Sequence, residues 1–331
     1  MSRADEIRLM TKVARMYYDQ GIRQQEITER LNIHQSTISR LLKRARESNI
    51  VRISVAIPLG TFSEMEEALA SRFSLREAIV VDSSEDEERL VRDLGAAAAF
   101  LVETSVKPGT VIGISSWSRA LLAMVDALHQ NDNGRGGKVV QILGGVGKAE
   151  TQYHATQLAQ ELAKRISATA ILLQAPGVVG TAEARRVLSR DPSVLAASGL
   201  FESIDLALVG IGCMEPSKLL SNSGNVFSPA EREELSNQGA VGDICLRFFD
   251  QGGNLVKSPL MNRVIGIELD DLKKAKRVVG IAGGVRKIPA ILAALRGGWI
   301  NVLLTDRSTA ETLLSNKADG APPKSRRRPL I

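Results

Sequence analysis

Apolar residues recur at helical spacing through the first fifty positions of the chain and then change to strand-like alternation. Three helices are predicted there, over residues 4–20, 24–31 and 35–49. Gly21 ends the first helix, and the short link 32–34 joins the other two. A strand is predicted next, because apolar residues alternate with other residues at Val51, Ile53, Val55 and Ile57.

From about residue 75 the pattern changes to short apolar runs that alternate with amphipathic stretches. The predicted strands are 77–82, 110–115, 138–144, 168–174, 205–211, 244–249, 263–269, 276–282 and 300–306. The predicted helices between them are 87–106, 117–130, 151–164, 229–238, 287–296 and 308–314. Several of these strands are uninterrupted apolar runs bounded by Gly or Asp, as in strands buried on both faces of a parallel sheet.

The two patterns predict an α/β protein with two folded parts. A small all-α head is followed by a domain with a doubly wound, mostly parallel, Rossmann-like sheet. The turn-like sequence over 250–254 adds some antiparallel pairing. We expect the head to span 1–60, the α/β domain to span 61–316, and residues 317–331 to form a basic, disordered tail.

Composition narrows the class of protein. Hydrophobic residues make up 44% of the 331 residues and charged residues 24%, which is ordinary for a globular protein. Two cysteines cannot form a disulfide framework, and three scattered histidines argue against a zinc site. No apolar run is long enough for a membrane span, and the N-terminal residues lack the apolar core of a signal peptide. We therefore expect a soluble, cytoplasmic protein without a metal or a cofactor.

The net charge of +6 is unevenly distributed along the chain. Residues 1–60 carry eleven Lys and Arg against six Asp and Glu, and residues 317–331 carry five against one. The residues between them carry 27 basic and 30 acidic side chains. A basic head on a slightly acidic body is typical of nucleic-acid binding, because cations neutralise phosphates and release counterions. A solvated charged surface is the alternative that charge alone leaves open.

The second and third predicted helices carry the packing pattern of a helix-turn-helix. Apolar residues would fill the narrow space where such helices cross, at Ile27, Leu31, Ile33, Ile38 and Leu41. The usual motif has Ala at the position of Thr28 and Gly at the turn position of Asn32. Both departures are mild, since Thr is only somewhat larger than Ala and Asn tolerates a left-handed turn better than other non-glycine residues.

Polar and basic residues occupy the face of the third helix that would be exposed. The N-terminal end of such a helix enters a major groove, where Gln and Arg read adenine and guanine edges and Ser and Thr bind phosphates or bases. The packing pattern of the two helices occurs together with a polar N-terminal end and a basic face on the third helix. We therefore favour DNA binding over a generic three-helix bundle. The candidate DNA-binding residues are Gln24, Gln35, Ser36, Thr37, Ser39, Arg40, Lys43 and Arg44.

Residues 21–55, GIRQQEITERLNIHQSTISRLLKRARESNIVRISV, resemble the head of the SorC family of sugar-binding transcriptional regulators. That family joins such a head to an effector domain related to the sugar-phosphate isomerase and CoA-transferase folds. The elements predicted over 61–316 run in the order that this resemblance requires. The resemblance also implies a homodimer or homotetramer held together by the effector domains.

Several runs in the body resemble parts of catalytic motifs, but none of these motifs is complete. Glu150 and Glu215 replace the third glycine in two runs that otherwise resemble a dinucleotide fingerprint. Ala149 stands where a phosphate loop has the Ser or Thr that holds magnesium. The run Gly113–Trp117 lacks the final glycine of a nucleophile elbow. We therefore expect no enzyme activity.

A polar loop after one predicted buried strand is suited to ligand binding. In such sheets ligands bind at the carboxyl ends of the strands, and helix N-termini attract anions. Backbone N–H groups, three hydroxyls and a guanidinium would suit a phosphate or a polyhydroxyl ligand, whereas the alternative is a capped helix without a ligand. In the SorC family the matching loop holds phosphate or sugar oxygens, with a glycine commonly at the position of Ser118. The candidate residues are Ser115, Ser116, Trp117, Ser118 and Arg119.

Four further residues in the body are candidates for ligand contact. Gly144 and Gly145 mark a loop where the backbone must approach either another chain segment or a ligand. Asp243 resembles the family's acidic residue that accepts hydrogen bonds from sugar hydroxyls, and an ordinary turn aspartate is the alternative. The stretch Ile281–Asp306 resembles the family's glycine pair, lysine and closing helix. This resemblance implies that Lys287 contacts the ligand, against the alternative of a solvated helix surface.

These features predict a DNA-binding transcriptional regulator of carbohydrate metabolism. A sugar, polyol or sugar phosphate bound in the C-terminal domain would control its affinity for operator DNA. Because one helix-turn-helix reads about half of an operator, we expect at least a homodimer. The alternative is a sugar-phosphate isomerase-like enzyme with an added DNA-binding head, since such enzymes share the fold.

Overall fold

The structure is a computed structural model that describes residues 3–48, 50–51, 61–147 and 149–316. The chain divides into two compact units, Met1–Leu59 and Gly60–Ile331, called here the head and the body. The strand predicted after Val51 and the basic tail over 317–331 lie outside the described residues.

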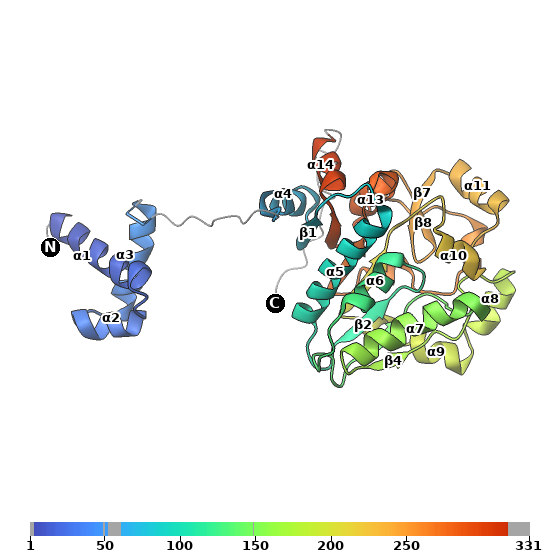
Figure 1. Ribbon diagram of the computed structural model, residues 1–331, viewed down its shortest axis with the longest axis horizontal. Coiled ribbons are helices and arrows are strands. Elements are labelled where there is room, and N and C mark those ends of the chain that lie inside the picture. Colours follow the sequence, from blue (N-terminus) through green and yellow to red (C-terminus); the bar gives the residue numbers. More distant parts are fainter. Residues whose placement is uncertain (1–2, 49, 52–60, 148, 317–331) are drawn as a thin grey trace. The chain divides into compact units, whose positions relative to one another are not determined.

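The head consists of three helical segments (Figure 1). The first helix, α1 (Arg3–Ala14), continues into a π-helical turn, η1 (Arg15–Asp19), and Gly21 follows with a φ of 66°. The next two are α2 (Gln24–Leu31) and α3 (Gln35–Glu47). Their bounds agree closely with the predicted helices.

The head has an apolar core of its own. Ile27 and Ile38 are fully buried there with Val13 from α1, and Leu41 is almost fully buried. Asn32 ends α2 with a φ of 53° and a ψ of 46°, the left-handed conformation that its place in the turn requires. The predicted helix-turn-helix packing is therefore confirmed.

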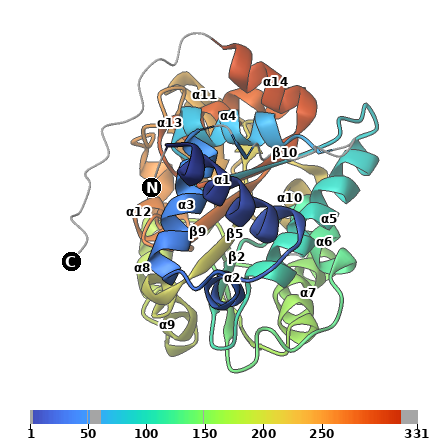
Figure 2. The same ribbon diagram turned by 90° about the vertical axis from the view of Figure 1, so that its left-hand side faces the viewer.

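A seven-stranded sheet runs through the body, and all of its strand pairs are parallel (Figures 1 and 2). The strands stand in the order β1-β10-β9-β5-β2-β3-β4. Their bounds are β1 (Glu77–Val81), β2 (Val111–Ile114), β3 (Lys138–Gln141), β4 (Thr169–Ile171), β5 (Leu206–Gly210), β9 (Arg277–Ile281) and β10 (Val302–Asp306). The order reverses between β2 and β5, and such a switch point is where α/β sheets bind ligands.

Helices cover both faces of this sheet (Figure 2). On one face lie α5 (Glu87–Ser105), α6 (Arg119–Ala127) and α7 (Ala149–Arg165). On the other face lie α4 (Ser63–Phe73), α13 (Ile288–Arg296) and α14 (Arg307–Ser315). An apolar core lies between the sheet and the helices on each face. Within β5, Leu206 and Leu208 belong to the core under α5, α6 and α7. Ala207 and Val209 belong to the core under α4, α13 and α14. The predicted doubly wound α/β fold is confirmed.

Smaller elements surround this framework. They are α8 (Ala182–Leu188), α9 (Pro192–Ser198), η2 (Phe201–Ser203), α10 (Lys218–Ser223), α11 (Pro229–Asn237), η3 (Pro259–Arg263), α12 (Leu269–Leu272) and η4 (Val285–Lys287). Among the described residues, none of the helices combines the length and the apolar composition needed to cross a bilayer.

The strand predicted over 244–249 is wrong, because this run contains the turn of a hairpin. The turn joins β7 (Ala240–Ile244) to β8 (Arg247–Asp250), and β6 (Gly212–Cys213) completes a small antiparallel sheet with them. Cys245 and Leu246 form the turn with φ values of 52° and 60°. Both side chains are buried, so the run has the apolar composition of a strand although its backbone reverses. The predicted turn over 250–254 is present, since the Asp250 N–H donates to the Asn254 carbonyl.

The strand predicted over 263–269 is also wrong. The segment makes only isolated bridges, from Val264 and from Gly266, before α12 begins. The guanidinium of the buried Arg247 donates to the carbonyls of Val264 and Ile267, both at 3.4 Å. A side chain therefore satisfies backbone acceptors that a neighbouring strand would satisfy in a sheet.

Candidate functional sites

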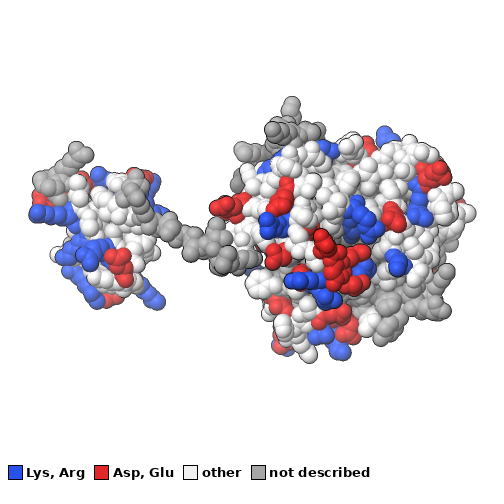
Figure 3. Space-filling view, turned by 45° about the horizontal axis from the view of Figure 1, so that its top comes forward, with Lys and Arg blue, Asp and Glu red and all other residues white. Residues whose placement is uncertain are grey.

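The head presents polar and basic side chains of α3 to solvent. The start of α3 adds the partial positive charge of its free backbone N–H groups. Lys and Arg side chains gather on the surface of the head (Figure 3). Of the candidate DNA-binding residues, Gln24 and Thr37 are half-buried, and the exposed ones are Gln35, Ser36, Ser39, Arg40, Lys43 and Arg44.

Contacts within the head restrict some of these side chains. The Ser39 hydroxyl donates to Gln24 Oε1 at 2.8 Å, which ties α3 to the first residue of α2. The Arg44 guanidinium pairs with Glu6 of α1. The Arg40 guanidinium makes no hydrogen bond or ion pair within the described part of the chain, and it extends from the exposed face of α3. Arg40 is therefore the arginine of this set that is available to a base edge or a phosphate.

A cavity of about 590 Å³ opens in the body at the carboxyl ends of β2, β5 and β9. It lies at the switch point of the sheet, between the loops that follow β2 and β5. Its wall also includes residues of β6, β7 and β8 and of α5, α10 and α11. Its volume is in the range of sites that enclose a small organic ligand.

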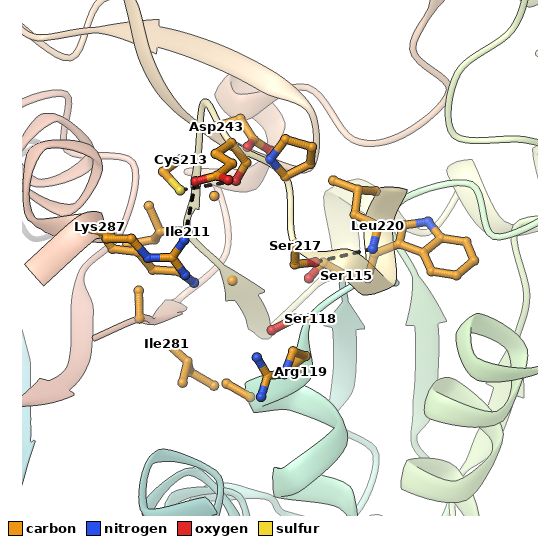
Figure 4. A pocket seen from close by; sticks show the side chains of 18 of the residues that line it. Ser115, Ser118, Arg119, Ile211, Cys213, Ser217, Leu220, Asp243, Ile281 and Lys287 are labelled. Carbon is orange, nitrogen blue, oxygen red and sulfur yellow. Dashed lines mark hydrogen bonds and ion pairs between the residues drawn. The ribbon is translucent and has the colours of Figure 1, made fainter. Parts of the chain in front are cut away.

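Six of the nine predicted effector-binding residues line this cavity. In Figure 4, Asp243 and Lys287 lie with Cys213 on one side of it, and residues of the loop after β2 lie on the other side. Residues separated by more than a hundred positions in the sequence are thus brought around one space. The six residues are Ser115, Trp117, Ser118, Arg119, Asp243 and Lys287.

The loop after β2 is fixed by hydrogen bonds behind the cavity. The Ser116 hydroxyl donates to the Leu143 carbonyl at 2.6 Å, and the Trp117 indole N–H donates to the Gly144 carbonyl at 3.4 Å. The Ser118 hydroxyl caps α6 by accepting from the Leu121 N–H. These hydrogen bonds hold the loop in a position that leaves Ser115 and Ser118 in the cavity wall.

Ser116, Gly144 and Gly145 do not line the cavity. Ser116 is buried, and its hydroxyl also accepts from Gln141 Nε2 at 2.9 Å. A Cβ on Gly144 would lie 2.4 Å from the Pro176 carbonyl oxygen, and one on Gly145 would lie 2.1 Å from Gln141 Nε2. Of the two alternatives that the sequence leaves open, the close approach at these glycines is to other chain segments.

The Asp243 carboxylate depends on a glycine in the neighbouring strand. Gly212 of β6 pairs with Asp243 of β7, and a Cβ on Gly212 would lie 2.0 Å from Asp243 Oδ1. The Leu246 N–H donates to Asp243 Oδ2 at 2.9 Å. Burial raises the pKa of Asp243 to about 6, although the Leu246 N–H and the charge of Lys287 act in the opposite direction. The oxygens of this carboxyl group are hydrogen-bond acceptors in the cavity wall.

Lys287 is placed by the glycine pair that precedes it. Gly284 has a φ of 90°, and its N–H donates to Asp306 Oδ1 at 2.8 Å. A Cβ on Gly283 would lie 2.5 Å from the same oxygen, so the turn needs both glycines. Burial lowers the pKa of Lys287, and the nearby Cys213 and Asp243 oppose that shift.

Other cavity residues carry no distinctive sequence signal. Glu87 and Glu88 start α5 and form ion pairs with Arg119. Lys218 of α10 and Arg232 of α11 also line the cavity. Arg232 Nε is buried without a hydrogen-bond partner among the described residues. These residues lie in stretches where charged side chains are expected on any helix surface, so sequence patterns could not assign them to a site.

The cavity has the donors and acceptors that a hydroxylated ligand requires. Hydroxyls, carboxylates, lysines and arginines surround it, together with apolar side chains such as Trp117 and Phe227. Within the described part of the chain, no group of three or more His, Cys, Asp and Glu side chains could hold a metal ion.

Comparison with known proteins identifies both units. Residues 58–315 match the family described as "Putative sugar-binding domain", and residues 3–52 match the family described as "Homeodomain-like domain". The chain is 36% identical over 319 residues to the sorbitol operon regulator of Klebsiella pneumoniae, which covers 95% of this chain and 100% of the relative. It is 33% identical over 309 residues to the deoxyribonucleoside regulator of Bacillus subtilis, with 93% and 97% covered.

A solved structure extends the similarity to the whole fold. The crystal structure of the full-length sorbitol operon regulator SorC from Klebsiella pneumoniae superposes with a TM-score of 0.71 at 37% identity. The match covers 94% of this chain and 99% of that chain. These relatives are named as regulators and not as enzymes.

Proposed function

Because the chain belongs to the SorC family of sugar-binding transcriptional regulators, we propose that a small carbohydrate in the body's cavity controls the affinity of the head for operator DNA. The chain is a DNA-binding transcriptional regulator, and its relatives give no support to the isomerase-like alternative. The control by a ligand in this cavity is our inference. It rests mainly on one observation, that Asp243 and Lys287 lie across the cavity from the polar loop after β2.

We assign a sugar, a polyol or a sugar phosphate as the effector. Asp243 would accept hydrogen bonds from vicinal hydroxyls, and Lys287 would donate to the ligand's oxygens. Ser115 and Ser118 would contact the opposite side of the ligand, and Trp117 would pack against its carbon skeleton. Ligand binding would remove water from these polar groups, and each group that loses water costs free energy unless it forms a hydrogen bond with the ligand.

We assign the DNA contacts to the N-terminal half of α3. Gln35, Ser36 and Arg40 would reach base edges, and Lys43 would contact the phosphate backbone. One head reads about half of an operator, so the functional protein would be at least a homodimer, and a homotetramer is compatible with the same logic. The protein would act in the cytoplasm, where the DNA is.

The regulation requires a thermodynamic linkage between cavity and head. The effector can change operator affinity only if it binds one arrangement of the paired heads more tightly than another. A tenfold change in operator affinity needs a difference of about 1.4 kcal/mol in effector binding between the two arrangements. A few hydrogen bonds that form in one arrangement alone would be sufficient.

A calorimetric binding screen tests the first requirement of this proposal. The full-length protein would be titrated with a panel of sugars, polyols and sugar phosphates, alongside the Lys287→Ala variant. We expect at least one compound to bind the wild type and to bind Lys287→Ala at least about tenfold more weakly, as is typical for the loss of one charged hydrogen bond. The proposal would fail if no compound bound, or if binding were indifferent to Lys287 and to Asp243→Asn.

A further inference from the structure

Charged side chains form a continuous row along the solvent-exposed side of the cavity. We call this row the charged rim, and it comprises Glu215, Arg286, Glu87, Arg119 and Glu88 in that spatial order. All five residues line the cavity, although they come from four separate segments of the chain. The exposed side of the cavity is therefore bordered by ion pairs.

The two arginines of the rim share one acceptor. Glu87 Oε1 lies 3.0 Å from Arg119 Nη1 and 3.6 Å from Arg286 Nη2. Each arginine also has a carboxylate that it does not share. Arg119 Nη2 contacts Glu88, and Arg286 Nη1 lies 3.3 Å from Glu215. One nitrogen of each guanidinium is thus held by its own partner, while the other nitrogen faces the shared oxygen.

This arrangement has the chemistry of an anion site that is already occupied. Guanidinium groups bind carboxylate and phosphate oxygens in the same planar geometry, and a phosphate offers more charge and more acceptors. Glu87 is 60% exposed, Arg286 is 68% exposed and Arg119 is 31% exposed, so the contacts of Glu87 with the two arginines are solvent-screened ion pairs that each contribute little. A stronger anion that arrives with a ligand could therefore displace Glu87 at small cost.

We propose that Arg119 and Arg286 form an anion subsite at the entrance of the cavity. Glu87 occupies this subsite in the unliganded protein, and the phosphate group of a phosphorylated carbohydrate replaces it. Glu88 and Glu215 keep the two arginines in place during the exchange. A neutral sugar leaves Glu87 where it is, so the rim discriminates between phosphorylated and free forms of one carbohydrate. The inference rests on the proposed function for the carbohydrate part of the ligand only.

The test uses inorganic phosphate as the probe and the full-length chain. Its affinity would be measured by calorimetry for the wild type and for Glu87→Gln, which keeps the shape of the side chain and removes its charge. We expect Glu87→Gln to bind phosphate roughly two- to fivefold more tightly, the upper part of the range of an exposed ion pair. Adding Arg286→Gln to Glu87→Gln should remove this gain.

Glu88→Gln is the matched control. It removes the same charge from the same helical turn, but Glu88 contacts Arg119 alone. We expect it to give no gain in phosphate affinity, because Glu88 positions Arg119 and does not occupy the place that phosphate would take. An unchanged affinity in Glu87→Gln, or an equal gain in Glu88→Gln, would overturn the proposal, because the effect would then be one of net charge.

A second arm separates a phosphorylated ligand from free phosphate. Glucose 6-phosphate and glucose would be titrated as a matched pair, or the corresponding pair of the carbohydrate found by the screen. Arg286→Gln should weaken the phosphorylated member several-fold and leave the free sugar unchanged, and equal weakening of both would contradict the subsite. If no carbohydrate binds while inorganic phosphate responds as predicted, the proposed function fails and the subsite stands.

Discussion

The side chain of Asp243 is largely buried, and the loss of hydration raises the pKa of its carboxyl group from 3.8 to about 6. The folded protein therefore binds a proton at Asp243 more tightly than the unfolded chain does. The stabilisation that this provides is complete below pH 4 and is lost as the pH rises through 6. At neutral pH the ionised Asp243 lowers the stability of the body, and a bound hydroxyl donor would offset part of that cost.

Replacing Asp243 by Asn should remove this pH dependence. Asn keeps an oxygen that can accept from the Leu246 N–H, but it carries no charge. We expect Asp243→Asn to be more stable than the wild type at pH 8, by up to about 3 kcal/mol, and to match it below pH 4. Urea unfolding of the body between pH 4 and pH 8 measures this difference. A difference that does not vary with pH would show that the charge of Asp243 is not the cause.

Arg40 is the residue on which the DNA-binding surface can be tested most simply. Its exposed guanidinium has no partner in the described part of the head, so Arg40→Ala should not disturb the fold. We expect the substitution to cost roughly 1–3 kcal/mol of specific DNA binding and to relax the preference at one base pair. Fluorescence anisotropy with the operator and with single-base variants of it measures both effects.

Arg30→Ala provides a control for Arg40→Ala with the same change in net charge. Arg30 lies on α2 and pairs with Glu26 at 2.6 Å. The Arg30→Ala variant should lose much less DNA affinity than Arg40→Ala, and it should keep its preference at every base pair. Equal losses in the two variants would assign Arg40 to general electrostatic attraction.

At the scale of single elements, β6 exists in its present place because Gly212 has no side chain. Gly212→Ala would put a Cβ 2.0 Å from Asp243 Oδ1 and would force the carboxylate away from the Leu246 N–H. We expect a loss of about 1–3 kcal/mol in the stability of the body and a weaker response to the effector.

Gly180→Ala is the control for Gly212→Ala, since a Cβ at Gly180 would meet no atom within 4 Å. Chemical denaturation of both variants measures the effect. Near-native stability is expected for Gly180→Ala. The packing argument would be refuted if the two glycines behaved alike.

Sequence patterns specify some elements of this fold and fail to specify others. The sequence pattern predicted the parallel strands well, because helices bury both faces of the inner strands and also carry a periodic pattern. It failed at Cys245 and Leu246, where two buried apolar residues adopt positive φ without a glycine. It failed again near Val264, whose carbonyl is satisfied by the distant side chain of Arg247. Both failures depend on tertiary contacts that no local pattern contains.

The sequence also predicted some residues of the cavity and missed others. Asp243 and Lys287 were found by resemblance to a family, and the structure brings both to one cavity. Ser116 belongs to the same polar loop but faces inward, because the neighbouring Leu143 carbonyl lies within hydrogen-bonding distance. Glu87 and Arg232 could not be found, since a charged residue on a helix gives the same signal whether it faces solvent or a cavity.

For the whole molecule, the distribution of charge separates two tasks. The head carries an excess of positive charge that is suited to phosphate backbones, whereas residues 61–316 carry 27 basic and 30 acidic side chains. DNA affinity should therefore fall with rising salt, while the binding of an uncharged sugar should not. The regulatory function requires that occupation of the cavity in the body changes how strongly paired heads hold an operator.

The most direct test of this account is the affinity of the full-length protein for the DNA upstream of its own gene. Fluorescence anisotropy at one fixed salt concentration would give that affinity with and without the carbohydrate identified by the binding screen. We expect the carbohydrate to change operator affinity at least about tenfold in the wild type. We expect no change in Lys287→Ala, which should still bind the DNA. An operator affinity that stays constant while the carbohydrate occupies the cavity would contradict the account.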